Sequence, residues 1–259
     1  MKDVSLGVVA LLQARMSSSR LPGKVLLPCG ESTFLGQQIM RIRSSRLISK
    51  IIVLTSTHES DDSIANYCNN LNIPVFRGNL HDVYQRFYDY LNSLSQEMKY
   101  FVRLTADCPF ACGDLIDEVV RIALDSDCDY ASNTLLPTFP DGMDVEVVKI
   151  ASFLKLNDYK LNSYEREHVT PGLYFRPEIF SLANLSTSPN FSNFRLTLDT
   201  KWDADFLSRI SDLYPNLVAV PTYSKIRDLI TSDEENFPQT QIRNAISKGP
   251  WVEYSYPHE

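Results

Sequence analysis

Short apolar runs alternate with helical patterns through the first half of the chain, and this alternation limits the folds that it can adopt. Residues 6–12 (LGVVALL) and 50–54 (KIIVL) are continuous apolar runs, as expected of strands that are buried on both faces. Between them, Leu35, Ile39 and Ile42 follow the spacing of one helix face. Four such strand–helix units within roughly the first 125 residues predict an α/β fold with a mostly parallel sheet. The other strands of this region are predicted at 74–76 and 100–104, and the other helices at 64–71, 83–94 and 115–123.

The second half of the chain has a less regular pattern. Apolar runs predict strands at 130–132, 143–150, 194–198 and 217–220, and a helix follows at 206–213. After about residue 231 the chain becomes polar and carries three prolines, Pro238, Pro250 and Pro257. We therefore expect one domain over residues 1–230, followed by a peripheral C-terminal helix and tail over residues 231–259.

The balance of charge and the cysteine content exclude several classes of protein. The chain has 25 Lys and Arg against 32 Asp and Glu, a net charge of −7, whereas nucleic-acid binding favours a basic surface. No apolar stretch approaches the length that crosses a membrane. The five cysteines form no C-x-x-C pair and are typical of free thiols in a reducing compartment. These features predict a cytoplasmic protein that binds neither nucleic acid nor membrane.

The loop after the first predicted strand has the composition of an anion-binding loop. Residues 13–24 (QARMSSSRLPGK) carry three cations, Arg15, Arg20 and Lys24, among three serines, 17–19. Small residues let backbone N–H groups turn toward an anion that the cations neutralise. A polyphosphate fits this chemistry, although a solvated basic loop has the same composition. The loop matches neither the P-loop nor the dinucleotide-binding glycine motif.

Two aspartates follow predicted strands and are candidates for a metal site. Asp107 follows strand 100–104, and Asp199 follows strand 194–198. Ligands of such sheets bind beyond the carboxyl ends of the strands, and carboxylates beside phosphates hold Mg²⁺. Alternatively, Asp107 caps the turn before Pro109. Asp203 is a candidate cap for the helix that follows Asp199.

Three further polar clusters lie in predicted loops. They are candidate substrate contacts, but solvated surface has the same composition, and Asp82 and Arg86 have the i, i+4 spacing of a surface ion pair. His168 is a candidate base or hydrogen-bonding group. The clusters contain Arg77, Asp82 and Arg86; Asp141, Asp144 and Glu146; and Arg166, Glu167 and His168.

These segments together resemble the cytidylyltransferases that make CMP-linked acidic sugars, and within that family the spore coat polysaccharide biosynthesis protein F branch. The resemblance spans about residues 6–229. It implies a three-layer, Rossmann-like nucleotide-diphospho-sugar transferase fold with a mixed, mostly parallel sheet. It also implies a homodimer and an Mg²⁺-dependent reaction of CTP with a sugar-like acceptor in surface polysaccharide or glycoconjugate biosynthesis, with release of pyrophosphate. The segments that carry it are residues 13–24, 76–78, 103–109, 140–146, 167–171 and 195–200.

The resemblance also implies roles for individual residues. It implies that residues 1–230 form the catalytic domain. It also implies that Arg20, Lys24 and Asp107 are the catalytic residues. Asp107 and Asp199 are expected to hold the metal, while the three polar clusters face the acceptor. The expected nucleotide site consists of Leu11, Ala14, Arg15, Ser18, Arg20, Lys24, Arg103 and Thr105.

Three alternatives remain open at the level of sequence. A sugar-1-phosphate nucleotidyltransferase that uses UTP, GTP or dTTP has the same fold but usually begins with a glycine-rich loop, where this chain has Gln13, Ala14 and Arg15. A non-catalytic nucleotide-binding protein of the same fold would not need both aspartates and Lys24. A nucleic-acid-binding protein is disfavoured by the net charge of −7.

Overall fold

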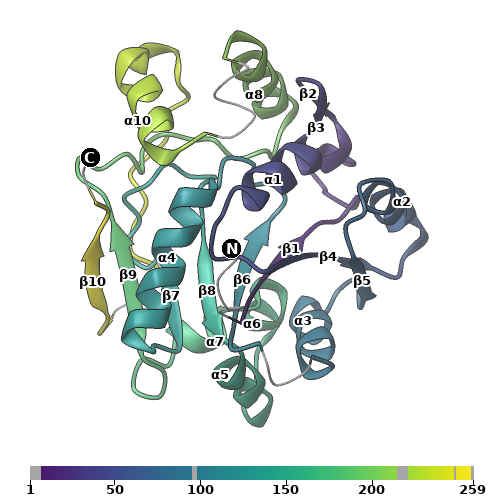
Figure 1. The fold of residues 1–259 in the computed structure, drawn as a ribbon, viewed down its shortest axis with the longest axis vertical. Helices are drawn as coiled ribbons and strands as arrows, with labels where there is room; N and C mark the ends of the chain where they lie inside the picture. The colour runs from purple at the N-terminus through teal and green to yellow at the C-terminus, as the bar shows by residue number, and fades with distance from the viewer. Residues whose placement is uncertain (1–6, 95–97, 215–220, 248, 258–259) are drawn as a thin grey trace.

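An eight-stranded sheet runs through the centre of the molecule (Figure 1). The computed structural model describes residues 7–94, 98–214, 221–247 and 249–257. The strand order is β10-β9-β7-β8-β6-β1-β4-β5, and β8 is antiparallel to both of its neighbours while all other neighbouring strands are parallel. The mixed, mostly parallel sheet is confirmed. Its strands are β1 (Val8–Gln13), β4 (Lys50–Ser56), β5 (Val75–Gly78), β6 (Tyr100–Thr105), β7 (Tyr130–Ser132), β8 (Glu146–Lys149), β9 (Leu182–Ser186) and β10 (Val252–Ser255), and β2 (Pro28–Cys29) and β3 (Ser32–Thr33) form a separate hairpin.

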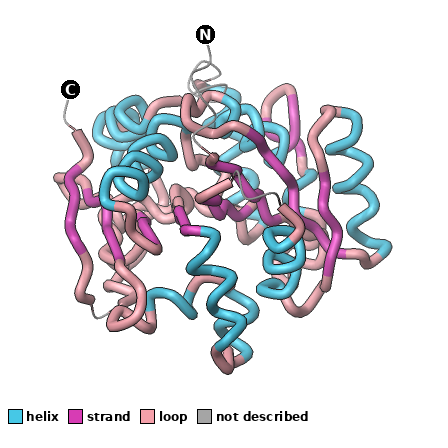
Figure 2. The backbone as a smooth tube through the Cα atoms, turned by 60° about the horizontal axis from the view of Figure 1, so that its bottom comes forward, coloured by secondary structure: helices cyan, strands magenta, loops and turns pink. Residues whose placement is uncertain are grey.

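Helices cover both faces of this sheet and form the outer two layers (Figure 1, Figure 2). The sequence of strand β1 is apolar because both of its faces are buried. Val8, Ala10 and Leu12 pack into the core beneath α1, α2 and α4, whereas Val9 and Leu11 pack into the core on the α3 and α5 side. The helices are α1 (Phe34–Arg43), α2 (Asp62–Asn70), α3 (Val83–Asn92), α4 (Gly113–Ser126), α5 (Ile150–Lys155), α6 (Ser163–His168), α7 (Pro171–Tyr174), α8 (Lys201–Leu213) and α10 (Tyr223–Ser232), with 3₁₀ turns η1 (Lys24–Leu26), η2 (Glu59–Asp61), η3 (Leu156–Asp158) and η4 (Glu234–Asn236).

Strand β1 is the point at which the strand order reverses. From β1 the chain moves to β4 on one side, and β6 later pairs with its other side. In such sheets the loops at the reversal separate and leave a crevice at the carboxyl edge. The loop after β1 and the loop after β6 border this crevice. Strand β8 runs the other way, so its first residue, Glu146, lies at the same edge, opposite Arg103.

The second half of the sheet differs from the prediction. Residues 194–198 do not form a strand, because Phe194 and Arg195 make only isolated bridges, with Gln239 and Asp141 respectively. Strand β9 was not predicted, because the buried Asn184 interrupts its apolar pattern. The Asn184 side chain bonds Leu136 and Glu253, which satisfies its amide inside the sheet. The strand predicted at 217–220 lies outside the described residues.

The C-terminal segment differs from the expected helix and tail, because its described residues after Ser232 form a 3₁₀ turn and a strand and no α-helix. Helix α10 ends at Ser232, and after η4 the chain passes the edge of the sheet and adds β10 in parallel to β9. The domain boundary near residue 230 stays a prediction. All five cysteines are free, as predicted, and all five are buried. None of the helices in the described part of the chain has the length and apolar character needed to cross a membrane.

Candidate functional site

A cleft of about 380 Å³ opens at the carboxyl edge of the sheet, beside β1 and β6. The loop after β1, the loop after β6 and residues 197–199 form its walls. Most of the predicted nucleotide and metal residues meet in this cleft. The predicted residues that line it are Ala14, Arg15, Ser18, Arg20, Lys24, Arg103, Thr105, Asp107, Asp141, Asp144, Glu167, His168 and Asp199.

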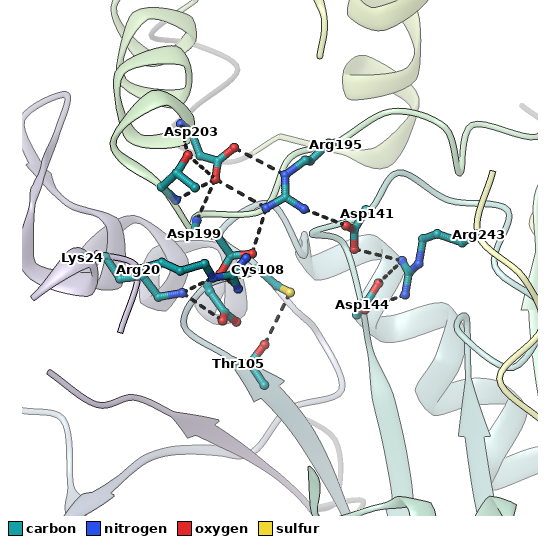
Figure 3. A network of polar contacts seen from close by, with 12 residues as sticks. Arg20, Lys24, Thr105, Cys108, Asp141, Asp144, Arg195, Asp199, Asp203 and Arg243 are labelled. Atoms are coloured by element: carbon teal, nitrogen blue, oxygen red, sulfur yellow. Dashed lines mark hydrogen bonds and ion pairs between the residues drawn. The ribbon is translucent and has the colours of Figure 1, made fainter. Parts of the chain in front are cut away.

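Lys24 contacts both candidate metal carboxylates, Asp107 and Asp199; Figure 3 labels Lys24 and Asp199. The Lys24 Nζ donates to Asp107 Oδ2 at 3.1 Å and to Asp199 Oδ1 at 3.0 Å. Gly23, with φ of 73°, turns the chain into η1 and directs Lys24 toward the cleft. Arg20 reaches Asp199 at 2.8 Å, and its side chain is 61% exposed. Two carboxylates from distant parts of the chain therefore share one ammonium group.

Asp199 is held by cations on several sides. Arg195 Nη2 donates to its Oδ2 at 2.8 Å. Burial alone would raise the pKa of Asp199, but the bonds and charges of Lys24, Arg195 and Arg20 more than offset burial and lower that pKa. The predicted cap of the following helix, α8, is corrected by three positions: Thr200 is the N-cap, and Asp203, inside the first turn, completes a capping box with it.

A second group of ion pairs continues from Arg195 along the cleft (Figure 3). Arg195 contacts Asp141 at 3.4 Å, and Arg243 contacts Asp141 at 3.3 Å. Arg243 also donates to both carboxylate oxygens of Asp144, at 2.8 and 3.0 Å. Gly142, with φ of 101°, lets this segment approach Leu196, because a Cβ there would lie 2.4 Å from the Leu196 carbonyl carbon. Burial first, and then the charge of Asp144, raises the pKa of Asp141.

A second cavity of about 300 Å³, which we call the side pocket, adjoins this cleft. Arg103, Thr105, Asp144 and His168 line both cavities. Glu146 forms an ion pair with Arg103 in the wall of the side pocket and accepts a hydrogen bond from the Tyr130 hydroxyl at 2.8 Å. Burial would lower the pKa of Arg103, but the charge and hydrogen bond of Glu146 more than offset this and raise it. The side pocket is lined by Arg103, Thr105, Thr134, Asp144, Glu146, Tyr164, His168, Thr170, Tyr174, Arg243 and Ile246.

His168 lies at the junction of the two cavities and is held there by an unusual turn. Val169 has φ of 74° and ψ of −56°, and the Thr170 N–H donates to the His168 carbonyl at 2.9 Å, which makes a γ-turn. This backbone costs a β-branched residue about 1–3 kcal/mol, and the full burial of Val169 in the core keeps it in place. The His168 ring packs against Tyr164, with ring centroids 4.3 Å apart. Burial lowers the pKa of His168.

Six predicted residues do not line the cleft. Leu11 is buried in the core, and Arg77 bonds the Ser56 carbonyl at 2.8 Å and Asp62 at 2.7 Å. The i, i+4 ion pair expected between Asp82 and Arg86 is absent among the described residues, because Asp82 caps α3 and bonds Arg166 at 2.7 Å. Arg86 is fully buried and donates to the Asn79 and Leu80 carbonyls, so it holds this loop in place. The residues outside the cleft are Leu11, Arg77, Asp82, Arg86, Glu146 and Arg166, and of these Glu146 lines the side pocket.

Sequence reasoning missed several residues of the site. Arg195 stands four residues before Asp199, but residues 195–199 are not helical, so this spacing did not signal their ion pair. Arg243 belongs to the segment assigned to a peripheral tail, and no local pattern marks it. The cleft also contains the unpredicted Gln13, Ser19, Val25, Val83, Ala106, Cys108 and Thr197.

Comparison with known proteins decides the family. Residues 9–247 match the cytidylyltransferase family. The chain belongs to that family. The fold and the nucleotidyltransferase class that the sequence predicted are thereby confirmed, and membership supports a transferase that uses CTP.

Relatives of this cytidylyltransferase occur among curated proteins and solved structures. It is 30% identical over 210 residues to the spore coat polysaccharide biosynthesis protein SpsF of Bacillus subtilis, covering 78% of this chain and 85% of that protein. It is 35% identical over 198 residues to an uncharacterized protein of Methanocaldococcus jannaschii, covering 74% and 78% of the two chains. A solved cytidylyltransferase of Leptospira borgpetersenii superposes with a TM-score of 0.83 at 30% identity, covering 92% of this chain and 99% of that one.

Proposed function

We propose that this cytidylyltransferase couples CTP to a sugar or sugar-like acceptor and releases pyrophosphate, in the biosynthesis of surface polysaccharide or glycoconjugate. The observation that carries the proposal is the Lys24 bridge between Asp107 and Asp199 at the point where the strand order reverses. Arg15 and Arg20 line the same cleft and add positive charge for a triphosphate. The name of the SpsF relative, a spore coat polysaccharide biosynthesis protein, supports the pathway. A homodimer and a cytoplasmic location remain predictions.

The two aspartates fit a magnesium ion as the metal of this site. Mg²⁺ is commonly bound through one or two carboxylates and takes its other ligands from water and substrate phosphates. No cluster of three or more His, Cys, Asp or Glu suited to a metal occurs in the described residues, so a site made of protein ligands alone does not fit them. The Lys24 ammonium forms ion pairs with both Asp107 and Asp199, and this supports the proposal that the two carboxylates can hold a cation. When bound, Mg²⁺ neutralises phosphate oxygens and acts as a Lewis acid.

The remaining chemistry is positioning and charge neutralisation by the chain itself. The acceptor oxygen attacks the α-phosphorus in line with the departing pyrophosphate. Lys24 and Arg20 bind the phosphate chain and neutralise the charge that develops on the leaving group. Arg15 has no ion-pair partner in the described part of the chain, so its charge is available to a phosphate. His168, whose pKa burial lowers, lies at the junction of the cavities and presents an imidazole that can accept the proton of the acceptor hydroxyl.

A thermal-shift panel with Mg²⁺ and each of CTP, UTP, GTP and ATP tests the proposal. We expect stabilisation by CTP alone, and its loss in EDTA. A ligand at about 100 times its dissociation constant adds roughly 2.7 kcal/mol to the free energy of unfolding, which is on the order of 5–10 °C for a chain of this size. A shift with UTP or GTP instead would assign another nucleotide to the cleft, and no shift with any nucleotide would refute the proposal.

Replacing Lys24 with methionine is expected to increase the affinity of the protein for Mn²⁺ in the absence of nucleotide. In the wild type, the Lys24 ammonium occupies the space between Asp107 and Asp199 and repels a second cation. Removing it leaves the carboxylate pair open, so we expect Kd for Mn²⁺ to fall about tenfold or more, which corresponds to about 1.4 kcal/mol. Electron paramagnetic resonance of free Mn²⁺ measures this.

The matched control is Lys149→Met, which removes a lysine that pairs with the exposed Asp127 at 2.8 Å and leaves Mn²⁺ affinity unchanged. Adding CTP to the wild type is expected to restore Mn²⁺ binding, because the phosphates draw Lys24 away from the aspartates. If the wild type alone bound Mn²⁺ as tightly as Lys24→Met, Lys24 would not occupy the metal position.

A further inference from the structure

Asp107 stands in a tight turn that follows β6. The Cys108 N–H donates to the Thr105 carbonyl at 2.9 Å, which closes a β-turn with Asp107 at its third position. The Thr105 hydroxyl also donates to Cys108 Sγ at 3.4 Å (Figure 3). The direction of the Asp107 side chain therefore depends on the backbone between Thr105 and Cys108.

A single buried amide group holds both ends of this turn. Gln38 of α1 is fully buried, and its Nε2 donates to the Thr105 carbonyl at 2.9 Å and to the Cys108 carbonyl at 3.0 Å. Both acceptors are carbonyl oxygens, so the nitrogen of the amide, and not its oxygen, must face them. Gln38 thus uses both of its N–H donors on the two residues that bracket the turn of Asp107.

The oxygen of the same amide group shows what the Gln38 side chain is placed to do. The Gln38 Oε1 is buried, and no described residue donates a hydrogen bond to it. A buried oxygen without a donor is costly, and an apolar side chain at this position would avoid that cost. The two carbonyls that it holds therefore explain the amide better than packing in the core does.

Arg41, one turn further along α1, holds the residue that follows the turn. The Arg41 Nη1 donates to the Pro109 carbonyl, and its Cζ lies 4.6 Å from the centroid of the Phe110 ring. Gln38 and Arg41 are three residues apart, so they share one face of the helix. This face of α1 therefore holds the segment from Thr105 to Pro109 by three of its backbone carbonyls.

The turn also affects the second candidate metal carboxylate. The Leu198 N–H donates to the Asp107 carbonyl at 2.8 Å, and Asp199 is the next residue. A shift of the turn would therefore change the distance between the Asp107 and Asp199 carboxylates. Mg²⁺ demands near-ideal octahedral geometry, and the ligand distances of metal sites hold to within about 0.2 Å. A small movement of the turn is enough to weaken such a site.

We propose that Gln38 is a positioning residue that fixes the turn of Asp107, so that the Asp107 and Asp199 carboxylates can hold one metal ion. This inference rests on the proposed function, because it takes the two aspartates as metal ligands. Gln38 is not among the residues that line the cleft or the side pocket, so it acts through the turn and not on a substrate. Removing a group that orients a metal ligand typically changes metal affinity about 10–100-fold.

Mn²⁺ binding to the full chain in the absence of nucleotide tests the proposal. The measurement is made in the Lys24→Met variant, in which the carboxylate pair is open, and electron paramagnetic resonance reports free Mn²⁺. We expect the additional change Gln38→Met to raise the Kd for Mn²⁺ about tenfold, because methionine keeps the length of the side chain but donates to neither carbonyl.

The matched control is Gln37→Met in the same Lys24→Met variant. Gln37 is the preceding residue of α1, is also buried, and donates through its Nε2 to the Cys29 carbonyl of β2 at 3.1 Å. This control removes a buried amide bond of the same kind, but one that does not reach the turn of Asp107. We expect it to leave the Kd for Mn²⁺ unchanged, and differential scanning calorimetry checks that both variants are folded.

The outcomes separate this inference from the proposed function. If the Gln38 and Gln37 variants bound Mn²⁺ with equal Kd, the positioning role of Gln38 would be wrong while the metal site would stand. If Lys24→Met itself bound no Mn²⁺, the metal site of the proposed function would be wrong, and this inference with it. Should Gln38→Met be unfolded, Gln38→Glu takes its place. Its carboxyl group can donate to at most one of the two carbonyls, so it is also expected to raise the Kd.

The Mg²⁺ requirement of pyrophosphate release gives a second readout, with Lys24 in place. We expect Gln38→Met to raise the Mg²⁺ concentration for half-maximal rate about tenfold, and Gln37→Met to leave it unchanged. A purely structural role would lower the maximal rate without changing this concentration. That result in Gln38→Met would overturn the proposal.

Discussion

Replacing Asp107 with asparagine is expected to lower the rate of pyrophosphate release about 10²–10³-fold while the protein remains folded. Removing one preorganised group that stabilises transition-state charge typically costs this much, and asparagine keeps the shape of the side chain but removes the charge that holds a metal. The Asp107 side chain is 40% exposed and bonds Lys24, so the fold does not depend on it. The assay uses CTP, Mg²⁺ and the best acceptor found in a panel of sugars.

Circular dichroism checks that the Asp107 variant is folded. Asp127→Asn is the matched control, because Asp127 is also an exposed aspartate paired with a lysine, and it lines neither the cleft nor the side pocket. We expect this control to keep wild-type activity. If Asp107→Asn lowered the rate of pyrophosphate release less than tenfold, the assignment of Asp107 to the metal site would be wrong.

Replacing Glu146 with glutamine is expected to lower the free energy of unfolding by about 3–5 kcal/mol, the range for breaking a buried ion pair on one side. The side chains of Arg103 and Glu146 are each only 11% exposed. The variant therefore leaves a buried guanidinium without its counter-charge. For a chain of this size the melting temperature falls by roughly 6–20 °C, which differential scanning calorimetry measures.

Two further variants separate the ion pair from a general effect of the substitution. Glu118→Gln removes a carboxylate that pairs with Arg121 on the surface and is expected to cost no more than about 1 kcal/mol. Combining Arg103→Met with Glu146→Gln removes both charges and is expected to recover part of the lost stability. If Glu146→Gln melted at the wild-type temperature, the buried pair would contribute nothing to the fold.

Strands buried on both faces were predictable, because their sequences are apolar throughout. Strands β1, β4 and β6 lie where their apolar runs predicted them. Strand β9 was not predicted, because Asn184 interrupts its apolar run. The Asn184 side chain donates hydrogen bonds to the Leu136 carbonyl and to the Glu253 carboxylate, and no local sequence pattern predicts these partners. Residues 194–198 have the composition of a strand, yet they make only isolated bridges, Arg195 with Asp141 and Phe194 with Gln239.

The sequence by itself determined the fold class and the position of the cleft. Parallel strands end at one edge, so polar residues that follow Gln13 and Thr105 must meet there, whatever the details of packing. Lys24 and Asp107 were found in this way. This logic depends only on local periodicity and on the direction of the strands.

Only the tertiary structure decided which charges pair and which residues line the side pocket. Arg243 and Asp144 are 99 residues apart in the chain, and their contact depends on the path that the C-terminal segment takes to β10. Arg103 and Asp199 likewise acquire partners from segments that local patterns do not connect. An ion pair forms where the fold brings two oppositely charged side chains together. The periodicity of the sequence does not predict the distance between two such side chains in the folded protein.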